Sequence, residues 1–597
     1  MNIAGAYPAR FFPNGCLASS EGVPPRCPLF TIVTWGAEIV ARSTQSRLGG
    51  LTEATASPKF GSSGAPTESR LGRYAGGMID GDSAHRPDRD SQPHNTADLA
   101  PNHRGTPLPS YVNAWVSTQR WFGNKGRVPA LRSIGHFALD CAEPGVTIRV
   151  DFVLDTASLT LTLYQLPTTE RFEELPGADN ALITVRQPGS LNARYIYDAA
   201  YDPAFAAALL AFMERQDVSV STKPTATDRS AASARGEDLR PRSTAPSSTT
   251  AATVISSRVL SGEQSNTSII VERVDASGSP AVPIICKVFR IIHAGENPDV
   301  TVQAALAGAG STRIPLPFGA VLGQWDDPAE PGQRAVGHLA FAQEFLPDAP
   351  DAWRTALIAA AAGSDFTGPA FRLGQATADV HHDLARTLPT LEASPEVIAE
   401  EMAKIKLRCS QTLREVPLLA KYQSAIEAVF ARAESAAWPR LQRIHGDFHL
   451  GQVLDVQGRG WVLLDFEGEP LRTLRERTRP DVPLRDVAGM LRSFSYVSGA
   501  MTATTAEAAV TLASAGSSSC AMTKNLPMIS DWAMACRGAF LDGYAERSGL
   551  KLAEQLALLE AFELDKALYE AVYESRNRPA WLPIPLAAIE RLVGTPD

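Results

Sequence analysis

The sequence lacks the marks of a disulfide-stapled or membrane-embedded protein. It has seven cysteines in 597 residues, and none form a C-x-x-C pair. An odd, scattered set argues against a disulfide framework and favours a reducing cytoplasm. No apolar run is long enough to span a bilayer, and the segment 29–40 is too short for an anchor and carries Glu38. We therefore expect no signal peptide and no membrane association.

An excess of positive charge is also lacking. The chain has 56 Lys and Arg against 65 Asp and Glu, a formal net charge of −9, so no basic footprint for nucleic acid exists at the level of the whole chain. A Walker A motif, G-x-x-x-x-G-K-[ST], is absent, which excludes the P-loop route to phosphoryl transfer. His445 and His449 have no third His or Cys nearby, so structural hydrogen bonding is favoured over zinc.

The length predicts several folded units rather than one core. The first hundred residues are rich in Gly, Ser, Pro and Arg without a sustained period, which is typical of disorder. One hypothesis is that translation begins at Met78. The fold class expected is α+β, divided into a disordered extension over 1–105, an N-terminal cap domain over 106–216, a flexible linker over 217–252, a small lobe over 253–346 and a helical large lobe over 347–597.

The order of elements in the small lobe carries the fold prediction. A strand over 254–260, a small polar turn and strands over 269–274 and 284–289 are followed by a helix that Asn297-Pro298-Asp299 starts, and then by a strand over 339–346. This order matches the small lobe of a protein kinase. In the cap, the alternation of Leu and Thr over 159–163 predicts an antiparallel strand, and Asp202-Pro203 predicts the start of a helix.

Two short motifs in the C-terminal third predict the chemistry. The segment 445–452 reads HGDFHLGQ, and 465–468 reads DFEG at the end of an apolar strand. Asp447 and Gln452 are separated like the Asp and Asn of the kinase motif H-R-D-x-x-x-x-N. Asp447 is thus the expected catalytic base. Gln452 and Asp465 are the expected Mg²⁺ ligands, because Mg²⁺ prefers carboxylate and amide oxygens, and Glu467 is a further ligand or an electrostatic neighbour.

The nucleotide site is expected in the small lobe. Lys287 lies inside an apolar strand and needs a partner there, for which ATP phosphates are the natural choice. The usual Glu of the following helix is missing, so Asp299 or Glu296 replaces it or the pair is absent. The small polar turn, with Gln264, Ser265 and Asn266, is expected to cover the phosphates. The hinge, with Glu344 and Leu346, is expected to bind adenine.

Four segments resemble one known family: SGEQSNTSII (261–270), HGDFHLGQVL (445–454), 465–494 and YEAVYESRNRPAWLPIPL (569–586). They are similar to actinobacterial maltokinases and glucosamine kinases, which belong to the aminoglycoside-phosphotransferase-like branch of the kinase fold. QRWFGNKGR (119–127) resembles the start of that family's cap domain. The resemblance implies a bilobal kinase-like fold, ATP, Mg²⁺ and a sugar acceptor, with Asp447 as base, Gln452 and Asp465 as metal ligands and Lys287 at the phosphates.

The acceptor is the open question. The resemblance places the acceptor site on the C-terminal helix segment, with Glu574, Arg576, Asn577 and Trp581, although Trp581 is equally consistent with a core residue. Acidic residues near the site favour glucosamine, phosphorylated on its 6-hydroxyl, over maltose. Maltokinase, a pseudokinase that only binds, and an aminoglycoside acceptor stay as alternatives. The expected partners are ATP and a small sugar, with neither nucleic acid nor membrane, in a monomer.

Overall fold

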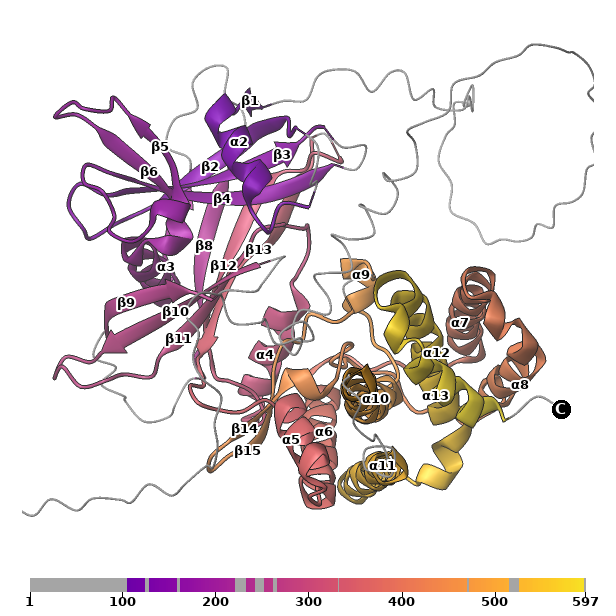
Figure 1. Ribbon diagram of the computed structural model, residues 1–597. Coiled ribbons are helices and arrows are strands. Elements are labelled where there is room, and N and C mark those ends of the chain that lie inside the picture. The colour runs from indigo at the N-terminus through magenta and orange to yellow at the C-terminus, as the bar shows by residue number, and fades with distance from the viewer. Residues whose placement is uncertain are drawn as a thin grey trace, which may run out of the picture.

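The chain folds into two sheets and a helical lobe, as a computed structural model shows for residues 105–123, 128–157, 161–220, 232–241, 252–260, 266–330, 332–469, 472–514 and 526–594. The cap sheet lies against a longer, twisted sheet, and the helices of the C-terminal half gather at the opposite end of that sheet (Figure 1). No helix within the described ranges is long and apolar enough to cross a bilayer. The expected α+β, bilobal, kinase-like architecture with a cap is confirmed.

The cap is a six-stranded antiparallel sheet in the order β1-β2-β3-β4-β6-β5. Its elements are β1 (Thr106–Pro107), α2 (Ser110–Thr118), β2 (Leu131–Leu139), β3 (Thr147–Asp155), β4 (Thr162–Arg171), η2 (Asp179–Ala181), β5 (Leu182–Arg186), β6 (Arg194–Asp198), η3 (Ala199–Tyr201) and α3 (Pro203–Arg215). The strand expected over 159–163 is β4, which begins at Thr162; residues 158–160 lie outside the described part. The predicted N-cap is confirmed, since Asp202 accepts a hydrogen bond from Ala204 N at 2.9 Å.

The second sheet has seven strands in the order β7-β8-β12-β13-β11-β10-β9. They are β7 (Val218–Val220), β8 (Ser233–Asp238), β9 (Thr253–Val259), β10 (Asn266–Val274), β11 (Ile284–Phe289), β12 (Pro317–Asp326) and β13 (Arg334–Glu344), with α4 (Pro298–Gly308) between β11 and β12. The helix at Pro298 and the strand over 284–289 are confirmed at their expected bounds.

The flexible linker expected over 217–252 is wrong for part of its length, because β7 and β8 lie within it. β8 reads SARGED and has no apolar alternation that sequence reasoning could detect. Backbone pairing with β12 and the close approach of α3 hold it in place, since a Cβ on Gly236 would lie 2.0 Å from Phe212 O.

The cap and the seven-stranded sheet share one hydrophobic core. They are also joined by buried hydrogen bonds of Asp198 with Arg290 and of Gln165 with two backbone carbonyls, a set that we call the lock. Phe152 of the cap lies 5.5 Å from Trp325 of β12, measured between ring centroids. Asp198, at the end of β6, accepts hydrogen bonds at 2.8 and 2.7 Å from Arg290, which follows β11, and both side chains are fully buried. Gln165 of β4 donates to the carbonyl oxygens of Phe289 and Leu339 at 3.0 and 2.8 Å. The cap and small lobe are therefore joined as one unit.

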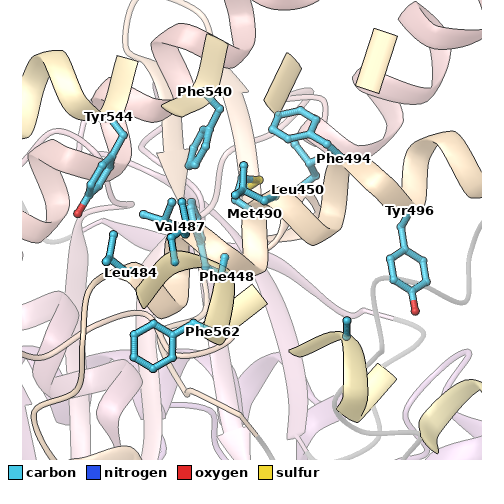
Figure 2. Packing of buried hydrophobic residues seen from close by; sticks show 14 of the residues in the cluster. Phe448, Leu450, Leu484, Val487, Met490, Phe494, Tyr496, Phe540, Tyr544 and Phe562 are labelled. Atoms are coloured by element: carbon cyan, nitrogen blue, oxygen red, sulfur yellow. The ribbon is translucent and has the colours of Figure 1, made fainter. Parts of the chain in front are cut away.

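The large lobe is helical around one short hairpin. Its elements are α5 (Ala352–Ala362), α6 (Thr367–Thr387), α7 (Pro395–Glu415), η4 (Pro417–Tyr422), α8 (Gln423–Glu434), η5 (Leu450–Gln452), β14 (Val453–Val456), β15 (Gly460–Leu463), α9 (Leu474–Arg477), α10 (Leu484–Ser514), α11 (Leu526–Ser548), α12 (Leu552–Asn577), η7 (Pro579–Trp581) and α13 (Pro583–Val593). Phe448 and Leu450 anchor the loop before the hairpin, because they insert among buried residues of α10 that include Val487 and Met490 (Figure 2).

Candidate active site

One buried carboxylate binds the backbone of the loop that carries Asp447. Asp486, near the start of α10, accepts hydrogen bonds from the backbone N–H groups of His445 and Gly446 at 2.7 and 2.9 Å. The ring of His381 lies 3.0 Å from the same carboxylate. Asp486 thus ties this loop to the start of α10. Asp447 therefore sits on a backbone fixed at two consecutive residues.

The two motif loops meet at a pair of glycines. Gly446 has φ of 84°, and a Cβ there would lie 3.1 Å from Gly468 Cα, so the close approach requires glycine. His445 bridges the same loops, because its Nε2 lies 2.7 Å from Leu464 O and its ring centroid lies 4.8 Å from that of Phe466. The structural interpretation of His445 is thereby confirmed.

Lys287 lies at the centre of an acidic cluster that joins the two lobes. Its Nζ is 2.7 Å from Asp299 Oδ2, 2.7 Å from Asp465 Oδ1 and 3.8 Å from Glu467 Oε1. Asp299, in the first turn of α4, therefore takes the part of the missing helix Glu. Asp299 Oδ1 also accepts from the backbone N–H of Phe466 at 2.8 Å, which fixes the second motif to the small lobe. The sequence left Asp299 and Glu296 as possible replacements for the helix Glu, and in the structure it is Asp299 that pairs with Lys287.

The three carboxylates of this cluster fit a hard cation. One ligand atom from each of Asp299, Asp465 and Glu467 lies within 4.8 Å of the others. Gln452 Nε2 donates to Asp465 Oδ2 at 3.1 Å, so its amide group lies at the edge of the same cluster. Asp465 has φ of 63°, a left-handed conformation that Asp tolerates and that is enriched at functional sites. The expected metal residues Gln452, Asp465 and Glu467 are thus brought together, and carboxylate and amide oxygens suit Mg²⁺.

Burial and the neighbouring charges shift the pKa values of Lys287 and Glu467 in this cluster. Burial alone would lower the pKa of Lys287, but the surrounding carboxylates raise that pKa well above its ordinary value, so the side chain stays an ammonium. Burial, together with the neighbouring Asp465, raises the pKa of Glu467 to about 7. Lys287 therefore partly neutralises an acidic site that a bound metal ion would also neutralise.

The nucleotide residues expected in the small lobe are placed in part. Asn266, the first residue of β10, donates from Nδ2 to Glu467 Oε1 at 3.0 Å, so the end of the polar turn reaches the acidic cluster. Gln264 and Ser265 lie outside the described residues. Glu344 ends β13; its N–H donates to Leu316 O at 2.8 Å and its side chain pairs with Arg459 at 2.8 Å. Leu346 is half-buried beyond the strand end. Their adenine role stays a prediction.

A pocket opens beside Asp447 in the large lobe. It is lined by residues of α5, α10, α12 and the loop 445–452: Trp353, Asp447, Phe448, His449, Gly489, Arg492, Ser493, Tyr496, Lys566 and Glu570. Two buried donors of this lining, Trp353 Nε1 and Arg492 Nη1, have no hydrogen-bond partner among the described residues. Burying a donor without a partner is costly, so the pocket is suited to a ligand rich in oxygen acceptors.

The residues expected at the acceptor lie outside this lining. Glu574 is fully buried and accepts from Tyr496 Oη at 2.9 Å, which puts it behind a pocket residue. Trp581 stacks on Tyr496 with ring centroids 6.1 Å apart, whereas Asn577 donates to Tyr573 O at 2.9 Å. Arg576 pairs with Glu415 on the surface. Their acceptor role stays a prediction.

Sequence reasoning missed the pocket residues of α12 and α10. Lys566 and Glu570 stand eight and four residues before Glu574, on the same face of α12. That i, i+4 spacing was a detectable signal, since it places three charged residues on one stripe of α12. Arg492 pairs with Glu570 at 2.8 Å, and both are almost fully buried. The charged floor of the pocket is thus assembled from two helices far apart in the sequence.

Comparison with known proteins agrees with these features. The family model of the maltokinase N-terminal cap domain matches residues 115–202. Glucosamine kinase of Mycolicibacterium smegmatis is 29% identical over 350 residues, which cover 56% of this chain and 79% of the relative. Glucosamine kinase of Streptacidiphilus jiangxiensis is 26% identical over 361 residues, covering 56% and 73%.

Solved structures show the same fold. A glucosamine kinase in complex with glucosamine, ADP and inorganic phosphate superposes with a TM-score of 0.50 at 20% identity, covering 81% of this chain and 99% of the other. A second crystal form of glucosamine kinase gives a TM-score of 0.53 at 21% identity, with the same coverage. The resemblance expected from the motifs is therefore confirmed.

Proposed function

We propose that this relative of the glucosamine kinases, with its maltokinase-type cap, is an ATP-dependent sugar kinase that phosphorylates glucosamine. One observation carries the proposal. Asp447 lines a donor-rich pocket, and the adjacent motif loop holds Asp465 against Lys287 of the small lobe. A base at an acceptor pocket and a carboxylate–lysine pair on the neighbouring loop are the two parts that phosphoryl transfer from a nucleotide requires.

Each residue then has one role. Asp447 accepts the proton of the acceptor hydroxyl while that oxygen bonds to the γ-phosphorus and the bond to the leaving ADP oxygen breaks. Lys287, oriented by its ion pair with Asp299, would bind the phosphates in place of its present contact with Asp465. Gln452, Asp465 and Glu467 would hold Mg²⁺, which neutralises charge on the transferred group when bound.

The nucleotide would lie between the lobes. We assign the phosphates to Asn266 and the turn before it, with Gln264 and Ser265, and the adenine to the hinge after β13, with Leu346. Asn266 supports the assignment because its side chain already reaches Glu467 in the acidic cluster. The similar glucosamine kinase was solved with ADP, which agrees with a nucleotide as donor.

The pocket supports an amino sugar as the acceptor. Trp353 and Arg492 line this pocket and carry buried donors that have no partner among the described residues, and Trp353 adds an aromatic ring to the lining. Glu570 lines the same pocket, and burial raises its pKa above the ordinary value despite the pairing with Arg492. A substrate ammonium near this carboxylate would favour its ionised form. Glucosamine supplies both the hydroxyls and the ammonium that such a lining recognises.

The test is a coupled ADP-release assay with ATP and Mg²⁺, run in parallel with glucosamine, maltose, glucose and an aminoglycoside. We expect turnover with glucosamine, at a kcat/KM at least tenfold above that for any other acceptor. A preference for maltose would instead assign the chain to the maltokinases, in agreement with the cap. The absence of turnover with every acceptor would favour a pseudokinase and overturn the proposal.

A further inference from the structure

One positively charged side chain that lines the pocket, that of Lys566, does not belong to the loop that carries Asp447. The segment 445–452 contains neither Lys nor Arg. Lys566 of α12, 119 residues further along the chain, places its Nζ 3.5 Å from Asp447 Oδ1 and 4.0 Å from Glu469 Oε1. Its side chain is 23% exposed and lines the pocket with Asp447. A positive charge thus stands beside the expected base on the acceptor side.

A closed ring of ion pairs fixes the backbone of α12 at this point. The ring begins at Asp565, the residue before Lys566, which pairs with Arg485 at 3.2 Å, and Arg485 pairs with Asp481 at 2.7 Å. Asp481 pairs with Arg472 at 3.0 Å, and Arg472 pairs with Glu469 at 3.0 Å. Glu469 lies 4.0 Å from Lys566 and so completes the ring. Charged groups with several short partners hold one geometry better than isolated surface pairs. Lys566 is therefore held in position relative to Asp447 through groups other than Asp447.

The distances distinguish Lys566 from a purely structural ion pair. Lys287 lies 2.7 Å from each of its two carboxylate partners, which is a full charge-assisted contact. Lys566 lies 3.5 Å from its first partner, which is longer than the roughly 2.7–2.9 Å that such contacts prefer. Because it is partly exposed to the pocket, its ammonium can still donate to another group. Although burial lowers the pKa of Lys566, Asp447 and Glu469 raise it more, so the ammonium persists.

We propose that Lys566 is a positioning residue of the phosphoryl transfer. It orients the Asp447 carboxylate toward the acceptor hydroxyl and places a fixed positive charge beside the acceptor pocket. The inference rests on the proposed kinase function and adds to it a residue outside both sequence motifs. A positive charge placed before the reaction stabilises a developing anion without reorganisation, and removing one such group lowers kcat by roughly 10²-fold.

The test compares Lys566→Met, Lys566→Arg and the matched control Lys406→Met, a half-exposed lysine that pairs with Glu434. We expect Lys566→Met to lower kcat roughly 10²-fold while the KM for ATP changes less than about threefold. Lys566→Arg should recover at least a tenth of the wild-type kcat, and the control should match the wild type. A kcat of Lys566→Met within threefold of wild type would overturn the proposal, as would an equal loss in Lys566→Arg.

A second readout does not depend on turnover, so it separates this inference from the proposed function. Acetic anhydride labels only neutral amines, and mass spectrometry reports the rate at each lysine. In Asp447→Asn, the acetylation of Lys566 should rise about threefold or more, because the carboxylate that favours its ammonium is gone. Lys406 serves as the internal standard. An unchanged rate at Lys566 would refute the contact even if the wild type phosphorylates no acceptor in the panel.

Discussion

Replacing Asp299 with Glu restores the residue that protein kinases usually use, and we expect it to damage this enzyme. Asp299 is completely buried. Its two oxygens meet three donors: Lys287 Nζ at 2.7 Å, and Gln303 Nε2 and the N–H of Phe466, each at 2.8 Å. No part of the carboxylate faces solvent, so the extra methylene of Glu has to displace one of these donors.

The expected free-energy costs of substitutions at Asp299 follow from its burial and its charge. An added methylene in a well-packed site costs about 1–3 kcal/mol. Asp299→Asn keeps the volume but removes the charge, and breaking a buried ion pair costs about 3–5 kcal/mol. The cost here should fall near the lower end, because Lys287 keeps Asp465 at 2.7 Å. If about 3 kcal/mol were lost from transition-state binding, kcat/KM for ATP would fall roughly 10²-fold.

The assay measures kcat/KM for ATP by ADP release, together with urea unfolding of the same samples. The matched control is Asp326→Asn, a 43% exposed residue that lies 3.6 Å from Arg334, for which we expect less than about 0.5 kcal/mol. Wild-type kinetics and wild-type stability in Asp299→Glu would refute the reasoning. That result would mean that the site yields to a longer side chain and that burial does not select Asp.

Three further outcomes are expected. Asp447→Ala should remove most turnover and leave ATP binding near normal in a nucleotide titration, with the exposed Asp455→Ala as its control; a wild-type rate would exclude Asp447 as the base. Arg290→Met should lower the free energy of unfolding by about 3–5 kcal/mol, because Asp198 stays buried and charged, and adding Asp198→Asn should recover part of it; no loss in urea unfolding would contradict the lock. Burial favours the neutral acid of Asp565, but the neighbouring arginines lower its pKa below the ordinary value. The carboxylate therefore contributes stability above about pH 4, and this stability is lost as the pH falls through the lowered pKa. Asp565→Asn should make the free energy of unfolding depend less steeply on pH in the acid range, and an unchanged pH dependence would disprove this.

The parts of the fold that sequence reasoning reached are those with a local signal. The helix at Pro298 has an N-cap and a proline at its first turn, and β11 is a short apolar run, so both were predicted at their observed bounds. β8 has a polar sequence and depends on pairing with β12, a strand about eighty residues away. Local patterns carry no information about such a partner.

The same division holds for the site. Gln452 and Asp465 lie at the two ends of a hairpin, which brings their side chains within 3.1 Å of each other, and the roles of Asp447, Gln452 and Asp465 stay predictions. Lys566 reaches Asp447 only because α12 packs across the large lobe, so its position depends on tertiary structure. For Lys287, the sequence left the choice of partner open, and the burial of Asp299 in α4 decides it.

The lock between Arg290, Asp198 and Gln165 also bears on how this architecture can change in evolution. A module joined by an exposed linker can be gained or lost in one recombination event. Here, deletion of the cap would leave Arg290 without its carboxylate inside the small lobe, three residues from Lys287, and would uncover apolar side chains of β12. We expect the cap and the strand that carries Lys287 to be inherited together, as one unit of selection.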